Sequence, residues 1–150
     1  MNIEKYLNHT FSLQNNNKMT HNHVCLLVCN KKIYSCGTNN SRTSFNFNGN
    51  KYKFPSCHAE IEAIFKILSI KKKIKKKFDL YVSRIKNEHF KNSKPCIDCM
   101  NFIKKIGCIK RIIYTTGTKE IYNIEKINNI NLKSFTRSSG WKNFYKLSSK

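Results

Sequence analysis

Apolar residues near the N-terminus recur three and four positions apart, at Ile3, Tyr6, Leu7, Thr10 and Phe11. This spacing predicts a short amphipathic helix that ends in the polar stretch 14–18. The next two apolar runs, 24–28 and 33–36, flank the polar residues 30–32. An apolar run, a polar turn and a second β-prone run together predict a β-hairpin.

Residues 37–55 are rich in Asn, Ser, Thr, Gly and aromatic side chains and show no sustained period, so we expect a loop there. Helical spacing resumes after Pro55. Five apolar positions then fall on one stripe: Ile61, Ile64, Ile67, Leu68 and Ile74. This stripe predicts a helix over 57–74 that packs against a sheet.

The segments 79–84 and 111–115 are short, apolar in the middle and rich in Ile, Val and Tyr, which is typical of strands buried on both faces. Between them, residues 96–106 have helical spacing and end at Gly107, a common C-terminal cap. A strand, helix, strand unit implies a right-handed parallel crossover. The two strands should therefore be neighbours in one sheet.

The pattern fades after Lys119, because 121–127 fits a strand or a helix and the last 15 residues look loosely held. We therefore predict a three-layer α/β/α domain, with a mixed central sheet and helices on both faces. At 150 residues and 39% hydrophobic composition, the chain has material for one core, and we expect one domain over 1–150. Within it, 1–20 would be an N-terminal helix and polar linker, and 119–150 a C-terminal extension.

No stretch approaches 18 uninterrupted apolar residues, and the N-terminus lacks the order of a secretory signal, so we expect no membrane partner. Seven cysteines, an odd number, argue against a disulfide framework and for a reducing, cytoplasmic compartment. Four of them lie among aliphatic and aromatic residues and are expected to be buried small hydrophobes: Cys25, Cys29, Cys36 and Cys108.

The formal net charge of +21 would ordinarily indicate a polyanionic partner. Strongly AT-biased coding would also enrich Lys, Asn and Ile. It would favour Glu as well, however, and the chain has eight acidic residues against 29 basic ones. An attraction to phosphate is therefore expected.

Two short motifs contain the residue types of a catalytic metal site. His58 and Glu60 stand two residues apart, and Cys96 and Cys99 follow in the segment Pro95-Cys96-Ile97-Asp98-Cys99. One histidine and two cysteines provide three zinc ligands and leave a fourth position open, with Glu60 placed as a proton carrier. Cys57 could replace one ligand, although the site is complete without it. A closed structural zinc site would need a fourth Cys or His, so Glu60 favours catalysis.

The HxE and PCxxC motifs resemble those of the cytidine and deoxycytidylate deaminase superfamily. This resemblance implies a zinc cofactor and hydrolytic deamination, with zinc lowering the pKa of a bound water to about 7 and Glu60 moving its proton. The segments 92–96 and 138–140 resemble most closely a branch seen in large DNA viruses and some microbial eukaryotes.

The resemblance also names Asn39 as a substrate contact, although a turn-forming Asn explains the residue equally well. Arginine occurs only at Arg42, Arg84, Arg111 and Arg137. Arg84 ends a predicted strand and Arg42 follows Asn39, so either could hold a phosphate or pair with an acid. The lysine run 71–77 is interpreted as a solvated helix end.

The first substrate class is cytosine in a free nucleotide or nucleoside. The second is cytosine or adenine within single-stranded DNA or RNA, including transfer RNA, where Phe45, Phe47 and Tyr52 would stack on bases and lysines follow the backbone. A third is a nucleic-acid-binding zinc module without activity, against which the presence of Glu60 argues. We also expect a homo-oligomer.

Overall fold

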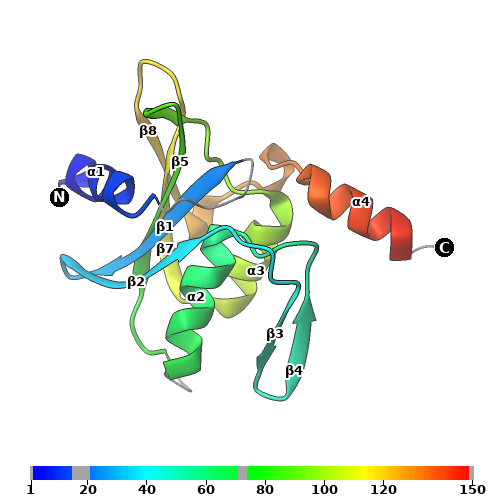
Figure 1. The fold of residues 1–150 in the computed structure, drawn as a ribbon. Coiled ribbons are helices and arrows are strands. Elements are labelled where there is room, and N and C mark those ends of the chain that lie inside the picture. Colours follow the sequence, from blue (N-terminus) through cyan, green and yellow to red (C-terminus); the bar gives the residue numbers. More distant parts are fainter. Residues whose placement is uncertain (1, 15–20, 71–73, 149–150) are drawn as a thin grey trace.

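The computed structural model describes residues 2–14, 21–70 and 74–148 (Figure 1). Its helices are α1 (Ile3–Ser12), α2 (Ala59–Ile70), α3 (Ile97–Ile106) and α4 (Ser139–Ser148), with 3-10 turns η1 (Ile127–Asn129) and η2 (Leu132–Ser134). Its strands are β1 (Asn22–Cys29), β2 (Lys32–Thr38), β3 (Ser44–Phe47), β4 (Asn50–Lys53), β5 (Phe78–Lys86), β6 (His89–Lys91), β7 (Ile109–Thr115) and β8 (Tyr122–Lys126).

The main sheet has the strand order β2-β1-β5-β7-β8, and the short β6 pairs with β5. Strands β5 and β7 are parallel, with Leu80 opposite Ile112, whereas the other pairs are antiparallel. The predicted hairpin is β1–β2, and its turn residues Asn30 and Lys31 both have positive φ. The predicted parallel pair with an intervening helix is confirmed as β5, α3 and β7.

Helices cover both faces of the sheet (Figure 1). Along β1, Cys25 and Leu27 belong to the core shared with α2 and α3, whereas Leu26 and Val28 pack with α1. This alternation follows from the two-residue period of a strand. The three-layer α/β/α arrangement with a mixed sheet is therefore confirmed.

Residues 44–53, predicted as part of a loop, instead form the hairpin β3–β4, so that prediction is wrong. Its turn is Asn48-Gly49, and both residues have positive φ. Asn-Gly is the strongest short-range signal for a two-residue hairpin, because both residues tolerate left-handed backbone. The short strand β6 was also not predicted, and it follows a similar positive-φ turn at Asn87 and Glu88.

Helix α2 is shorter than the predicted 57–74. It begins at Ala59 because Cys57 is held extended by two backbone hydrogen bonds with Asn40. Its last residue, Ile70, is 77% exposed. Ile74 lies outside the helix, and residues 71–73 are among those not described, as are 15–18 of the predicted polar stretch.

The C-terminal region is more ordered than the sequence pattern indicated. Residues 122–126 form the edge strand β8, which settles the choice between strand and helix. Phe135 is buried in the core, and α4 follows it. Within the last 15 residues, α4 is helical but mostly exposed, so the expectation of a loosely held end stays a prediction. Among the described helices, none is long and apolar enough to cross a membrane.

Gly37 places β2 directly against α2. A Cβ at this position would lie 2.2 Å from the Ala59 carbonyl oxygen and 2.6 Å from the Ala63 nitrogen, both backbone atoms. Gly37→Ala should therefore lower the free energy of unfolding by about 1–3 kcal/mol or more, measured by denaturant titration. Gly140→Ala is the control, because its Cβ would meet only Pro55 at 3.6 Å. Equal unfolding midpoints for the two variants would contradict this packing.

Candidate metal centre and active site

The starts of two helices bring the three candidate zinc ligands together. His58 immediately precedes α2, and Cys96 is the N-cap of α3, with its sulfur accepting a hydrogen bond from the Cys99 nitrogen at 3.4 Å. Both helices pack on the same face of the sheet. Residues far apart in the sequence therefore meet where the two helices begin, as the motif spacing predicted.

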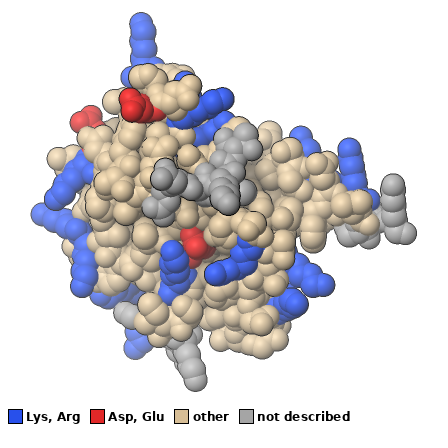
Figure 2. All heavy atoms as spheres, viewed as in Figure 1, with Lys and Arg blue, Asp and Glu red and all other residues tan. Residues whose placement is uncertain are grey.

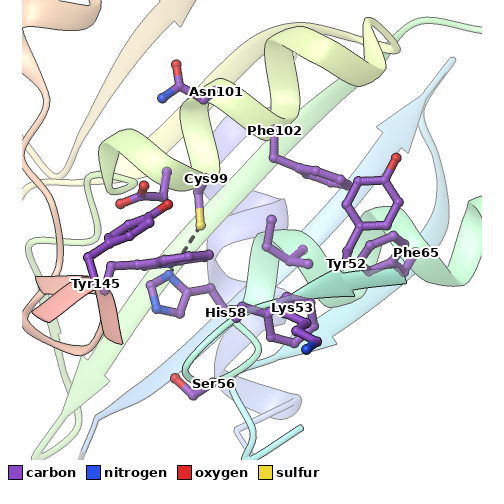
Figure 3. Close-up of a pocket in the computed structure, with 13 residues that line it drawn as sticks. Tyr52, Lys53, Ser56, His58, Phe65, Cys99, Asn101, Phe102 and Tyr145 are labelled. Carbon is purple, nitrogen blue, oxygen red and sulfur yellow. Dashed lines mark hydrogen bonds between the residues drawn. The ribbon is translucent and has the colours of Figure 1, made fainter. Parts of the chain in front are cut away.

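The three side chains form a compact cluster. The distance from His58 Nδ1 to Cys99 Sγ is 3.2 Å, and that from His58 Nδ1 to Cys96 Sγ is 3.6 Å. Figure 3 shows the Cys99 sulfur directed toward the His58 ring. A tetrahedral zinc ion would separate a nitrogen and a sulfur ligand by about 3.5 Å, given bonds of about 2.0 and 2.3 Å. The donor set therefore fits zinc in both chemistry and spacing.

Of the two cysteines in the cluster, Cys96 is the one whose thiolate form is favoured. A hydrogen bond from Cys99, followed by one from His58, lowers the pKa of Cys96 to about 4, whereas the bond with Cys96 and burial raise the pKa of Cys99. Burial lowers the pKa of His58, but the hydrogen bond to Cys96 and the charge of Glu60 outweigh it, and the net direction is upward. A thiolate is the form of cysteine that binds metals.

Glu60 lies in the first turn of α2 and is only 4% exposed. Burial raises the pKa of its carboxyl, and the neighbouring His58 opposes the shift. Glu60 stands two residues after the candidate ligand His58, and the charges of His58 and Cys96 both act on this carboxyl. A carboxyl with a raised pKa beside a metal site is suited to accepting and returning a proton.

Cys57 does not join the cluster. Its sulfur contacts the His58 carbonyl oxygen at 3.6 Å, and burial raises the pKa of its thiol to about 12. All seven thiols are free. The predicted burial of small thiols is confirmed for Cys25, Cys29 and Cys108, whereas Cys36 is partly exposed.

Asn39, the predicted substrate contact, is buried and holds the beginning of β1. Its Oδ1 accepts a hydrogen bond from the His23 nitrogen at 2.9 Å, and its Nδ2 donates to the His21 carbonyl oxygen at 2.5 Å. These bonds fix the backbone that carries both histidines. These hydrogen bonds give Asn39 a structural role, as a turn-forming Asn would have.

Arg84 lies near the end of β5, opposite His23 of β1. Its Nη2 donates to His21 Nδ1 at 2.9 Å, and its buried Nε has no hydrogen-bond partner. The pKa of His23 is lowered to about 4, first by burial and then by the charges of Arg84 and His58. The Nε2 of His23 also lacks a hydrogen-bond partner, and the charges of both Arg84 and His58 act on this ring.

Arg42 is exposed, and its backbone nitrogen donates to Asn40 Oδ1 at 3.0 Å. The alternative that these arginines pair with acids is wrong for Arg42 and Arg84 in the described part of the chain. The arginines that form ion pairs are Arg111, with Asp79, and Arg137, with Asp98. Arg84 is the better placed of the two predicted phosphate ligands.

A cavity of about 220 Å³ adjoins the cluster. Figure 3 shows Tyr145 beside His58 and Cys99 at one end, and Tyr52, Phe65 and Phe102 gathered at the other. The sequence analysis missed the contribution of α4 to this cavity. The spacing of Trp141, Phe144 and Tyr145 is helical and could have indicated that helix.

The aromatic residues predicted to stack on bases are used in packing. The Phe45 ring stacks on Phe65 with centroids 3.6 Å apart, and Phe47 packs against the core. Tyr52 contacts Phe65 and Phe102 and also lines the cavity. Through these ring contacts, the hairpin β3–β4 packs against α2 and α3.

Figure 2 shows Lys and Arg side chains spread around the visible face, with few acidic side chains among them. In the lysine run 71–77, positions 71–73 are among those not described. Lys76 donates to the Tyr34 hydroxyl at 2.7 Å and Lys77 to the Gly107 carbonyl oxygen. Lysines 75–77 are exposed, as predicted, but they lie in the non-helical segment after α2 rather than at a helix end.

Comparisons with known proteins agree with this site. The family model described as "Cytidine and deoxycytidylate deaminase zinc-binding region" matches residues 2–116. The structure is similar to apo dCMP deaminase from the cyanophage S-TIM5, with a TM-score of 0.50 and 24% identity, covering 78% of this chain and 84% of that one. For the same enzyme in complex with dCMP and dUMP, the TM-score is 0.49 at 22% identity, with 78% and 82% covered. A search of curated proteins found no match.

The likeness to the apo cyanophage enzyme confirms the predicted cytidine-deaminase-like fold. The family match covers both motifs, with His58 and Glu60 in the first and Cys96 and Cys99 in the second. The family description names a zinc-binding region, and the histidine and two cysteines within the matched residues form a cluster that could hold a metal ion. The chain therefore belongs to the zinc-binding cytidine and deoxycytidylate deaminase family.

Proposed function

We propose that the protein removes the exocyclic amine of cytosine, in a free nucleotide or nucleoside, by zinc-dependent hydrolysis. His58, Cys96 and Cys99 would hold the metal, and Glu60 would carry protons. The observation that carries this proposal is the cluster of three donors, with the buried Glu60 two residues after the first of them. Three protein donors leave a tetrahedral ion one position for water, which distinguishes a catalytic site from a closed structural one.

Zinc held by this cluster would act as a Lewis acid and lower the pKa of a water to about 7. Glu60 would accept a proton from the attacking water as the oxygen of that water forms a bond to C4 of the base. Glu60 then delivers the proton to the ring nitrogen N3. Its raised pKa supports this second role, because the carboxyl keeps a proton more readily than an exposed glutamate does.

The second half of the reaction breaks the bond between C4 and the exocyclic nitrogen. The remaining proton of the attacking water passes through Glu60 to the departing amine, which leaves as ammonia, and uracil remains. Water is consumed and no redox partner is needed. One carboxyl therefore serves first as base and then as acid.

Arg84, His21 and His23 form the best candidate site for a substrate phosphate. The guanidinium has an unpartnered buried Nε, and no acidic side chain among the described residues pairs with it. Arginine binds phosphate through two parallel hydrogen bonds. The dCMP deaminase activity named for the cyanophage enzyme makes a cytosine monophosphate the first substrate to assay. Asn39 remains a candidate contact to the sugar or base, and Arg42 the second candidate for the phosphate.

Replacement of Arg84 tests the phosphate assignment. Arg84→Gln should lower kcat/KM for dCMP by about ten- to a hundredfold, because a charged hydrogen bond is worth about 1.5–3 kcal/mol. Deoxycytidine, which has no phosphate, should be turned over at nearly the parent efficiency. Lys119→Gln is the control, since it removes one positive charge from an exposed position that has no assigned role. Equal losses on dCMP and deoxycytidine would mean that Arg84 has no phosphate role.

The high positive charge favours a second candidate, deamination within single-stranded nucleic acid. Lysine and arginine side chains are spread around the visible face rather than gathered in one stripe (Figure 2). The free nucleotide or nucleoside is therefore the first choice. Assembly of the chain into a homo-oligomer remains a prediction.

A further inference from the structure

A second cavity lies on the face of the sheet that α1 covers, and we call it the α1 cavity. Its volume of about 570 Å³ is within the roughly 300–1,000 Å³ of small-molecule sites. Its walls come from the beginning of α1, the turn between β1 and β2, and the first residues of β5 and β7. Four segments that are far apart in the sequence therefore meet around it.

The α1 cavity is separate from the metal cluster. Tyr81, which lines it, packs with α1, whereas the adjacent Leu80 packs with α2 and α3 on the other face of the sheet (Figure 1). The cavity reaches the beginnings of β5 and β7 through Asp79 and Arg111. The candidate cysteine ligands lie at the start of α3, and this helix of 10 residues leads back from the end of β5 to the beginning of β7 over about 15 Å. The two sites therefore lie on opposite faces of the sheet and at opposite ends of its parallel strands.

The lining of the α1 cavity is strongly basic. Its charged residues are Lys5, Lys31, Lys110, Arg111 and a single acid, Asp79. Asp79 is already engaged by Arg111 at 2.5 Å and by Lys110 at 3.7 Å. Within the described residues, neither Lys5 nor Lys31 takes part in an ion pair. A bound anion would offset the charge of these two lysines.

A buried hydroxyl group in the wall of this cavity lacks a partner. The Tyr81 side chain is 0% exposed, and its hydroxyl makes no hydrogen bond in the part of the chain that the structure describes. The hydroxyl of the adjacent Tyr6, in contrast, donates to the Lys31 carbonyl oxygen at 2.9 Å. Native proteins rarely leave a buried polar group unpaired, because its lost hydration is then not replaced. An acceptor oxygen of a ligand would satisfy Tyr81.

These residue types indicate a phosphate group. Lysine binds phosphate as a point charge, and a hydroxyl donates to a phosphate oxygen. Asn2, the N-cap of α1, also lines the cavity, and the positive end of a helix favours an anion. A further hollow of about 420 Å³ shares Lys110 and Arg111 with the α1 cavity and adds Lys126. The same surface therefore has room for a second phosphate.

We propose that the α1 cavity binds a phosphate group, with Lys5, Lys31 and Tyr81 as its recognition residues. This site is distinct from the one proposed for the substrate phosphate at Arg84, and it does not depend on the deaminase function. The phosphate belongs either to a small phosphorylated molecule or to the backbone of a nucleic acid strand. In the second case, the hollow beside Lys126 holds the next phosphate of the strand.

A titration with sodium phosphate at constant ionic strength tests the site. Amide NMR spectra of the zinc-loaded, ¹⁵N-labelled protein should show saturable shifts at Lys5, Lys31 and Tyr81. The Lys5→Gln, Lys31→Gln double variant should bind phosphate at least about tenfold more weakly, because it loses two charged donors. The Lys119→Gln, Lys133→Gln double variant is the matched control. It removes the same charge from exposed positions that line neither hollow, so its affinity should equal that of the parent.

Tyr81→Phe separates contact with the ligand from a role in packing. The variant keeps the ring, whose centroid lies 4.9 Å from that of Tyr6, and loses only the unpaired hydroxyl. Without phosphate, its thermal unfolding midpoint should equal or exceed that of the parent. Its affinity for phosphate should be about three- to tenfold lower. A lower midpoint with unchanged affinity would mean that the hydroxyl serves the fold and not a ligand.

Two further probes distinguish the sources of the phosphate. A strand predicts that dodecathymidylate binds at least a hundredfold more tightly than phosphate, shifts the Lys126 amide, and loses affinity steeply between about 50 and 200 mM salt. A small molecule predicts that glycerol 3-phosphate binds at least as tightly as phosphate and that the strand has no such advantage.

Two results would overturn the proposal. One is an affinity that the Lys5→Gln, Lys31→Gln variant leaves unchanged. The other is a set of shifts confined to Arg84 and His21 and abolished by Arg84→Gln, which would place all phosphate binding in the proposed substrate site. Ammonia release by the parent protein scores the deaminase function independently of these titrations.

Discussion

Glu60→Gln should lower turnover by at least about a thousandfold while zinc and fold are retained. General acid–base catalysis contributes about 10²–10⁴-fold, and here one carboxyl supplies both the base and the acid. Glutamine has nearly the same shape but cannot carry the proton. Because Glu60 is buried and burial raises its pKa, removing its charge should not destabilise the fold. On the purified variant, steady-state kinetics measures the loss of turnover, metal analysis measures the retained zinc, and thermal unfolding measures the stability of the fold.

Glu62→Gln is the matched control for this experiment. Glu62 lies two residues further along α2, where it accepts a hydrogen bond from the Thr38 nitrogen at 2.5 Å and pairs with Lys66 at 3.7 Å. Its loss should lower stability and leave turnover within a few-fold of the parent. If Glu60→Gln deaminates at nearly the parent rate, Glu60 is not the proton carrier.

Replacement of both Cys96 and Cys99 by serine should remove the zinc and a large part of the stability. Cys96 and Cys99 lie at the start of α3, and His58 immediately precedes α2. A bound metal would therefore join the starts of two helices. Zinc contributes about 10–16 kcal/mol to the folding of zinc-finger peptides. The loss here should be smaller but still several kcal/mol, because the sheet and its helices retain a core without the metal. Zinc content and unfolding with and without a chelator measure both effects.

Cys36→Ser controls for the loss of a thiol alone, since Cys36 is free, partly exposed and outside the cluster. It should retain one zinc per chain and the chelator-sensitive stability of the parent. Close to one zinc per chain in the Cys96→Ser, Cys99→Ser double variant would remove the assignment of the metal site.

Local patterns predicted most of the central fold. The two-residue and helical periods located the β1–β2 hairpin, β5, β7 and α3, because these elements bury apolar side chains on faces that recur regularly. The candidate ligands were predictable for a different reason. The motifs that contain His58, Cys96 and Cys99 combine residue types that are uncommon together. The helices that begin at these motifs bring the three side chains into one cluster.

What the sequence did not predict depends on contacts between distant segments. Phe45 belongs to a strand because its ring stacks on Phe65, a partner that no local pattern names, although the Asn48-Gly49 turn was a usable signal. His23 lies opposite Arg84 only because β1 pairs with β5. Likewise, Trp141 reaches the cavity because the segment before α4 is bonded to the beginning of α3.

The most direct test of the central claim is ammonia release by the zinc-loaded protein. The substrates are cytidine, deoxycytidine, their monophosphates, single-stranded DNA and transfer RNA, each assayed beside the Glu60→Gln variant. We predict that ammonia and the uracil product form in equal amounts, most efficiently from a monophosphate, and that neither forms with the variant. A folded protein with one zinc per chain that releases no ammonia from any of these substrates would contradict the proposed function.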